Sequence, residues 1–259
     1  MREALAIWRN TRLVVLTAVS ASLYAALLIP FKVLPLIPGV TELRPANAVP
    51  VVCSLLFGPA GAWGAAIGNL IGEFFGGIGP GDLFGFVGNF LYGFLPYAVW
   101  RAFSSEDPLP HTARRWVAFI AVVALASAAC ALVVGWGLNA LGFVPFAVLA
   151  NIIFLNNFAM AVVLSPLLLR AIYPRVKQAG LRYDDVVTDV PRRTRLRRGV
   201  ALAAVVVGTI GGFLVGNLLS TGRLEIAALA TDPPGPRAAQ VGFGLAPFVA
   251  LVLLGVLLL

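Results

Sequence analysis

Histidine, cysteine and charge are all scarce in this sequence of 259 residues. It contains one histidine, His111, and two cysteines, Cys53 and Cys130, both of which lie inside apolar runs. A Ser-His-Asp triad, a multi-histidine metal site and a disulfide framework are therefore not expected. Only 12% of the residues are charged, roughly half the share in an ordinary soluble domain. The sequence thus predicts no enzyme, no metal site and no cofactor.

Apolar residues, in contrast, make up 60% of the chain, and its mean hydropathy is +0.94. A soluble fold of this size cannot hide so much apolar side chain, because much of its surface stays in water. The 27 glycines and 18 prolines also suit membrane helices. We therefore predict an all-α polytopic protein of the cell membrane, with the lipid bilayer as its solvent.

A search for apolar spans of about 20 residues predicts eight membrane segments. They lie near residues 13–30, 47–58, 59–77, 82–103, 116–141, 146–172, 199–219 and 241–259. A turn signal at Gly58 and Pro59 separates the second from the third, and the second is short for a straight span. The longest polar stretch, 173–198, is predicted to be a basic linker. It divides a six-helix unit (1–172) from a two-helix C-terminal extension (199–259).

The net charge of +8 is distributed asymmetrically between the connecting segments. Fifteen of the 19 basic residues fall in one set of segments, and four, Lys32, Arg44, Arg223 and Arg237, fall in the other. The positive-inside rule assigns the first set, and with it both termini, to the cytoplasm. We interpret the arginine run at 192–198 as an orientation anchor that meets anionic headgroups. No aromatic platform accompanies it, so nucleic acid is not an expected partner.

Polar side chains collect in the outer half of the six-helix unit. Burial of a polar group in hydrocarbon costs free energy, so each such group is expected to have a structural or functional role. Asn69 and Glu73 lie one helical turn apart and hence on one face. The pattern predicts the wall of an outward-facing pocket for a small polar ligand with a flat ring. The candidate substrate-binding residues are Glu42, Arg44, Asn47, Asn69, Glu73, Asp82, Asn89, Tyr92, Trp136, Asn139 and Asn151.

Each of these candidates also has a purely structural interpretation. A single asparagine in a membrane helix more often bonds to a neighbouring helix than to a ligand, and Glu42 and Arg44 can form an ion pair within their loop. Asn156 and Asn157 are adjacent, so at most one of them is expected to face a pocket. A site that offers both a carboxylate and a guanidinium does not by itself select the sign of its ligand.

Small residues spaced by four mark the first helix. Ala18, Ser22 and Ala26 form one series, and Ala21 and Ala25 form another. Such a strip lets a second helix approach closely. We assign docking of a partner subunit to Ala18, Ala21, Ser22 and Ala25; packing within the chain itself is the alternative.

Four runs resemble the substrate-binding (S) components of energy-coupling factor (ECF) transporters. They are ELRPANAVP at 42–50, LFGPAGAWG at 56–64, GNLIGEFFG at 68–76 and FGFVGN at 84–89. Within that group the chain is most similar to QueT-like members, which are proposed to import queuosine precursors. The resemblance covers about residues 1–172. The two C-terminal helices depart from the family's usual six.

The resemblance implies a six-helix vitamin-binding unit that captures its substrate outside the cell. Such a unit then rotates within the membrane on a transmembrane coupling subunit driven by paired ATPases. Members dock through an Ala-x-x-x-Ala motif on the first helix, which Ala21 and Ala25 match. The family pocket, built from the first loop and the outer ends of later helices, matches by position Glu42, Arg44, Asn47, Glu73, Asp82, Asn89, Trp136, Asn139 and Asn151.

The sequence leaves open a purely structural or assembly subunit, with the C-terminal helix pair as its docking element, and two transport functions. The first is the substrate-capturing subunit of an ECF-type importer for a water-soluble vitamin or a related micronutrient, such as a queuosine precursor. The second is a self-sufficient secondary transporter for a small polar solute. Proteins of that class often carry inverted repeats and broken helices around a midplane site, and neither is clear in this sequence.

Overall fold

The eight predicted membrane segments are helical in the computed structural model, which describes residues 2–33, 35–37, 41–42, 44–104, 106–187, 194–229 and 237–259. The all-α prediction is confirmed. The α-helices are α1 (Arg2–Ala6), α2 (Thr11–Leu28), α3 (Ala48–Phe57), α4 (Pro59–Phe74), α5 (Asp82–Phe103), α6 (Ala113–Ala140), α7 (Phe146–Gln178), α8 (Tyr183–Val186), α9 (Arg195–Thr221) and α10 (Ala238–Leu258). Helix α7 continues past residue 172, where the sequence predicts its end.

Six of the helices in the described ranges are long and apolar enough to cross a membrane: α2, α5, α6, α7, α9 and α10. Helices α3 and α4 are shorter, with 10 and 16 residues. A ten-residue helix is about 15 Å long, roughly half of the hydrocarbon thickness. The loop before α3 must therefore reach into the bundle to meet the start of this helix.

That loop contains structure that the sequence does not predict. Two short strands, β1 (Pro35–Ile37) and β2 (Thr41–Glu42), pair antiparallel. A 3-10 helix, η3 (Pro45–Asn47), then leads directly into α3. At the other end of α3 the predicted turn is present, and Gly58 adopts a φ of +55° there. This conformation favours glycine, because a side chain would clash with the backbone.

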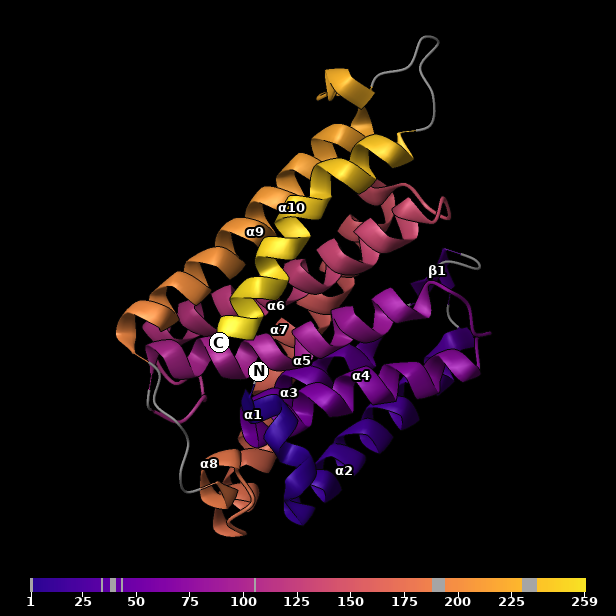
Figure 1. Cartoon of the computed structure of the whole chain (residues 1–259). Coiled ribbons are helices and arrows are strands. Elements are labelled where there is room, and N and C mark those ends of the chain that lie inside the picture. Colours follow the sequence, from indigo (N-terminus) through magenta and orange to yellow (C-terminus); the bar gives the residue numbers. More distant parts are fainter. Residues whose placement is uncertain are drawn as a thin grey trace.

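Both termini and α8 lie toward one end of the bundle, whereas β1, the end of α9 and the start of α10 lie toward the opposite end (Figure 1). An even number of crossing segments requires this arrangement. Arg9, Arg12, Arg114 and Arg115 lie at the start of α2 and of α6, at the end that holds the termini. The assignment of that end to the cytoplasm stays a prediction from the distribution of charge.

Helix α2 packs closely on α4 through small residues. A Cβ atom on Gly64 would lie 2.3 Å from the Cβ of Ser20, and one on Gly68 would lie 2.7 Å from the carbonyl oxygen of Ala21. Ala21 and Ala25 are only 3% and 4% exposed. They are therefore buried within the chain, contrary to the expectation that the whole strip faces a partner.

The other small-residue series on α2 has the opposite environment. Ala18, Ser22 and Ala26 are exposed, together with Val19 and Leu23. Helix positions four apart share one face, so two faces of the same helix carry the two series. The strip that remains open on the surface consists of Ala18, Ser22 and Ala26.

The packing of α2 on α4 predicts that Gly64→Ala destabilises the protein. The added methyl group overlaps Ser20, and overpacking of this kind typically costs about 1–3 kcal/mol. Gly199→Ala is the matched control, because a Cβ atom on Gly199 meets no atom within 4 Å. Thermal unfolding in detergent should show a lower midpoint for Gly64→Ala only; equal midpoints would contradict the close packing of α2 on α4.

Candidate functional site

A cavity of about 300 Å³ lies where α2, η3, α4, α5, α6 and α7 meet. Its volume is at the lower end of the range for small-molecule sites. The polar side chains that line it are Tyr24, Arg44, Asn47, Asn69, Glu73, Asp82, Asn89, Asn156 and Asn157. Cys130, Val134, Leu138, Phe143, Leu149 and Ile153 form an apolar wall.

Asn47, the last residue of η3, is the centre of a buried hydrogen-bond network at this cavity. The Tyr24 hydroxyl donates to Asn47 Oδ1 at 3.0 Å and lies 3.2 Å from Asn89 Oδ1. Asn47 Nδ2 in turn donates to Asn157 Oδ1 at 2.6 Å. Buried polar groups are nearly always hydrogen-bonded. The network therefore fixes the end of the first loop against α2, α5 and α7.

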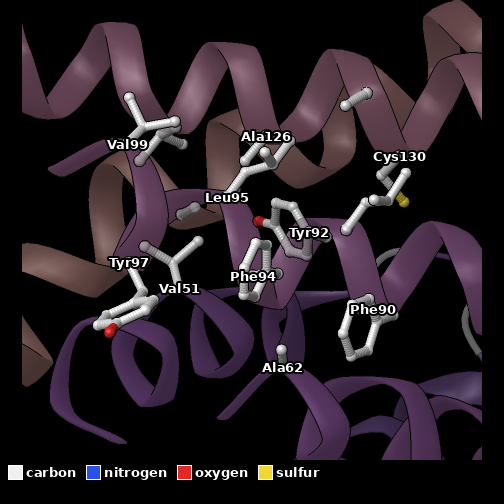
Figure 2. Close-up of a cluster of buried hydrophobic side chains, with 14 of the residues drawn as sticks. Val51, Ala62, Phe90, Tyr92, Phe94, Leu95, Tyr97, Val99, Ala126 and Cys130 are labelled. Atoms are coloured by element: carbon white, nitrogen blue, oxygen red, sulfur yellow. The ribbon is translucent and has the colours of Figure 1, made fainter. Parts of the chain in front are cut away.

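Tyr92 supports this network without lining the cavity. Its hydroxyl lies 2.9 and 3.0 Å from the carbonyl oxygens of Asn47 and Asn157, which share its one proton. Figure 2 shows its ring inside the apolar cluster that α5 forms with Val51 of α3 and Ala126 of α6. Tyr92 thus joins the polar floor of the cavity to the hydrophobic core of the bundle.

Charged side chains meet in the part of the cavity nearest the glycine-rich loop before α5. Arg44 Nη2 lies 3.6 Å from Glu73 Oε1, and the two side chains are 19% and 16% exposed. Asp82 accepts a hydrogen bond from the backbone N–H of Gly79 at 2.8 Å, which orders the loop. Among the described lining residues, one arginine against two carboxylates gives a formal net charge of −1. This balance disfavours an anionic ligand.

Asn69 carries a buried acceptor that the protein leaves unused. Its side chain is 2% exposed, and Oδ1 has no hydrogen-bond partner among the described residues. Leaving such a group unsatisfied costs about 1–3 kcal/mol. Asn69 lies one turn before Glu73 on α4 and lines the same cavity. A ligand that donates a hydrogen bond here removes the penalty.

Six of the eleven predicted substrate-binding residues therefore line one cavity: Arg44, Asn47, Asn69, Glu73, Asp82 and Asn89. Tyr92 lies beneath it. The backbone of Glu42 belongs to β2, but its side chain lies outside the part of the chain that the structure describes.

The remaining three predicted residues contact the C-terminal helices instead of the cavity. Trp136 and Asn139 donate to backbone carbonyl groups of α10, at 2.8 and 3.4 Å. Asn151 donates to Asn217 Oδ1 of α9 at 2.6 Å. All three lie near the ends of α6 and α7 that the sequence assigns to the outer half of the bundle, but they contact α9 and α10 there. Their role in the structure is to hold this hairpin.

Three polar lining residues are absent from the prediction: Tyr24, Asn156 and Asn157. Adjacent residues on a helix are about 100° apart, which led to the expectation that at most one of the two asparagines faces a pocket. Both line it, because the cavity extends around a wide sector of α7; Asn156 Oδ1 accepts from the backbone N–H of Arg44 at 3.3 Å. No pattern of spacing in the sequence distinguishes Tyr24 as a lining residue.

Comparison with known proteins identifies a family. A family model described as QueT transporter matches residues 14–174, more than half of the chain. The match begins in α2 and ends in α7, so it includes every residue named above as lining the cavity and excludes α9 and α10. No curated protein and no solved structure matches the chain.

The support beneath the cavity predicts that Tyr92→Phe weakens the fold. The substitution keeps the ring but removes the only hydroxyl that donates to both the Asn47 and Asn157 carbonyl oxygens among the described residues. A loss of about 1 kcal/mol or more in the free energy of unfolding is expected, measured by thermal or denaturant unfolding in detergent. Unchanged stability would show that these two hydrogen bonds do not hold the floor in place.

Proposed function

The chain belongs to the QueT transporter family, a family of ECF-transporter S components, and we propose that it captures a water-soluble vitamin or related micronutrient, such as a queuosine precursor, in the 300 Å³ cavity. It is thus a multi-pass membrane transport protein. The cavity opens to the outside of the cell, and both termini are cytoplasmic. The chemistry of the site is recognition only.

The unused acceptor of Asn69, one turn from Glu73, carries the proposal of a ligand rich in N–H groups. A carboxylate such as Glu73 accepts two parallel hydrogen bonds from the amidine-like edge of a fused-ring base. The formal net charge of −1 on the described lining residues favours a neutral or cationic molecule over an anionic vitamin. The apolar wall that includes Val134, Leu138 and Phe143 contacts the face of the flat ring.

Energy for uptake comes from partners: a transmembrane coupling subunit and the paired ATPases of an ECF module. The exposed strip of Ala18, Ser22 and Ala26 on α2 is the docking surface in this proposal, since small side chains let a partner helix approach closely. Ala21 and Ala25 contribute indirectly, because they seat α2 against the rest of the bundle.

Substitution of Glu73 tests the ligand site. Glu73→Gln should weaken binding by more than about 1 kcal/mol, roughly fivefold, because a neutral amide cannot accept two charge-assisted hydrogen bonds. Calorimetry with a panel of water-soluble vitamins and deazapurine bases, guided by the mass of any compound that co-purifies, measures the change. Glu225→Gln makes the same chemical change outside the cavity, where Glu225 pairs with Arg237, and should leave affinity unaltered. Equal affinities for all three proteins would remove Glu73 from the site.

The two faces of α2 predict opposite results for two leucine substitutions. Ala18→Leu with Ser22→Leu should prevent co-purification with the coupling subunit yet preserve ligand binding, because both residues are exposed. Ala21→Leu should instead lower the thermal unfolding midpoint, because it overpacks the contact with α4. Complex formation that survives the Ala18/Ser22 double substitution would contradict the docking assignment.

A further inference from the structure

A second cavity, of about 670 Å³, lies at the end of the bundle that holds both termini. Its wall comes from the C-terminal turns of α5, Ser104, residues 106–108, α8 and the first turn of α9. Figure 1 shows α8 and both termini gathered at this end. The cavity lies far along the helix axes from the first one, and no lining residue is shared between them.

The carboxylates of this second cavity are already engaged by the chain. Each of the four has a partner: Glu3 with Tyr97, Glu106 with Arg115, Asp107 with Lys177, and Asp184 with Arg101. Partial burial raises the pKa of the Asp107 carboxyl, but hydrogen bonds from Lys177 and Tyr173 outweigh it and hold that pKa below its ordinary value. Each described acid of the wall thus has a partner within the chain.

Two arginines of the wall have no such partner. Arg195 and Arg198 form no ion pair or side-chain hydrogen bond with any residue in the described ranges, and both line the cavity. They lie three positions apart in the first turn of α9, hence on one face. Arg182, in contrast, is committed to Asp185 at 2.7 Å. The cavity therefore holds two surplus guanidinium groups, whose planar fork suits a phosphate.

Exposed apolar side chains occur on the same elements that form this cavity, as a lipid site requires. Leu196, between them in the sequence, is 79% exposed, and Phe103 at the end of α5 is 75% exposed. Leu55, Leu56 and Phe94 line the cavity itself. Helix α9 is long and apolar enough to span the bilayer, so its first turn lies at the level of the headgroups. A free anion needs none of these apolar contacts.

We propose that this cavity is a specific site for the headgroup of an anionic phospholipid, with its phosphate between Arg195 and Arg198 and its acyl chains along Leu196 and Phe103. The inference is independent of the ligand captured at the other cavity. It assigns to the first turn of α9 a discrete binding site, as distinct from a diffuse attraction of basic residues to the membrane surface.

Native mass spectrometry of the full-length protein with phosphatidylglycerol and phosphatidylcholine tests the site. Arg195→Gln with Arg198→Gln should lower the affinity for phosphatidylglycerol by roughly tenfold or more, with little change for phosphatidylcholine. The matched control is Arg114→Gln with Arg197→Gln. It removes the same charge from exposed positions, one of them in the same helical turn, that do not line the cavity. The control should change the affinity less than about twofold.

Several results would overturn the proposal: equal losses in the two double variants, no loss in either, or displacement of the lipid by excess inorganic phosphate, which would indicate a free-anion site. Thermal unfolding checks that each variant folds. Should the double glutamine variant fail to fold, Arg195→Lys with Arg198→Lys decides the question. It keeps both charges but loses the planar fork, so weaker binding of phosphatidylglycerol supports the site and unchanged binding contradicts it.

Discussion

The polar groups of Asn47 need hydrogen-bond partners in the middle of a bundle that lipid surrounds. The shape of the rest of the cavity depends on which residues supply these partners. Hydrocarbon offers no water to a polar group, so the chain has to supply every partner. Tyr24, Asn157 and Tyr92 do so, from three different helices. The shortness of α3 makes this necessary, since its N-terminal end lies inside the bundle. The polar floor of the site is the same network that holds the first loop in position.

Beside this network, one buried hydrogen-bond acceptor of the cavity has no partner among the described residues. Asn69 Oδ1 has no partner in the described part of the chain, although Asn69 lies on the same helix as Glu73 and lines the same cavity. An unsatisfied group of this kind costs free energy in the empty protein, and a ligand with a matching donor recovers it. A site that gains a hydrogen bond when the ligand enters is suited to binding without ATP. Such binding requires no conformational change driven by a partner subunit.

The sequence predicts well how far along a helix each polar residue lies. It predicts poorly which side of the helix that residue occupies. Lengths of apolar runs suffice to place the eight segments, and polar residues at one depth include Arg44, Asn69 and Glu73, which do meet. Trp136, Asn139 and Asn151, which the sequence assigns to the same outer half, contact α9 and α10 instead. Their direction depends on where the C-terminal hairpin packs, which no local pattern reveals. The sequence likewise does not reveal that Ala21 of α2 is buried against another helix whereas Ala18 is exposed.

The C-terminal hairpin also limits how a partner can approach. Helices α9 and α10 cover one side of α6 and α7 through hydrogen bonds and close contacts, such as that of Gly216 with Phe146. The matched family region ends before this hairpin. We propose that the exposed face of α2 is the docking surface for the coupling subunit, whereas the hairpin packs as an integral part of the bundle.

Uptake by the chain alone, reconstituted in liposomes, tests the central claim most directly. A substrate-capturing subunit should bind its vitamin or deazapurine tightly without ATP and move none of it across the membrane, with or without an ion gradient. Restoring transport should require the coupling subunit and the paired ATPases. Accumulation driven by a proton or sodium gradient in liposomes that contain only this chain would contradict the account and identify a self-sufficient secondary transporter.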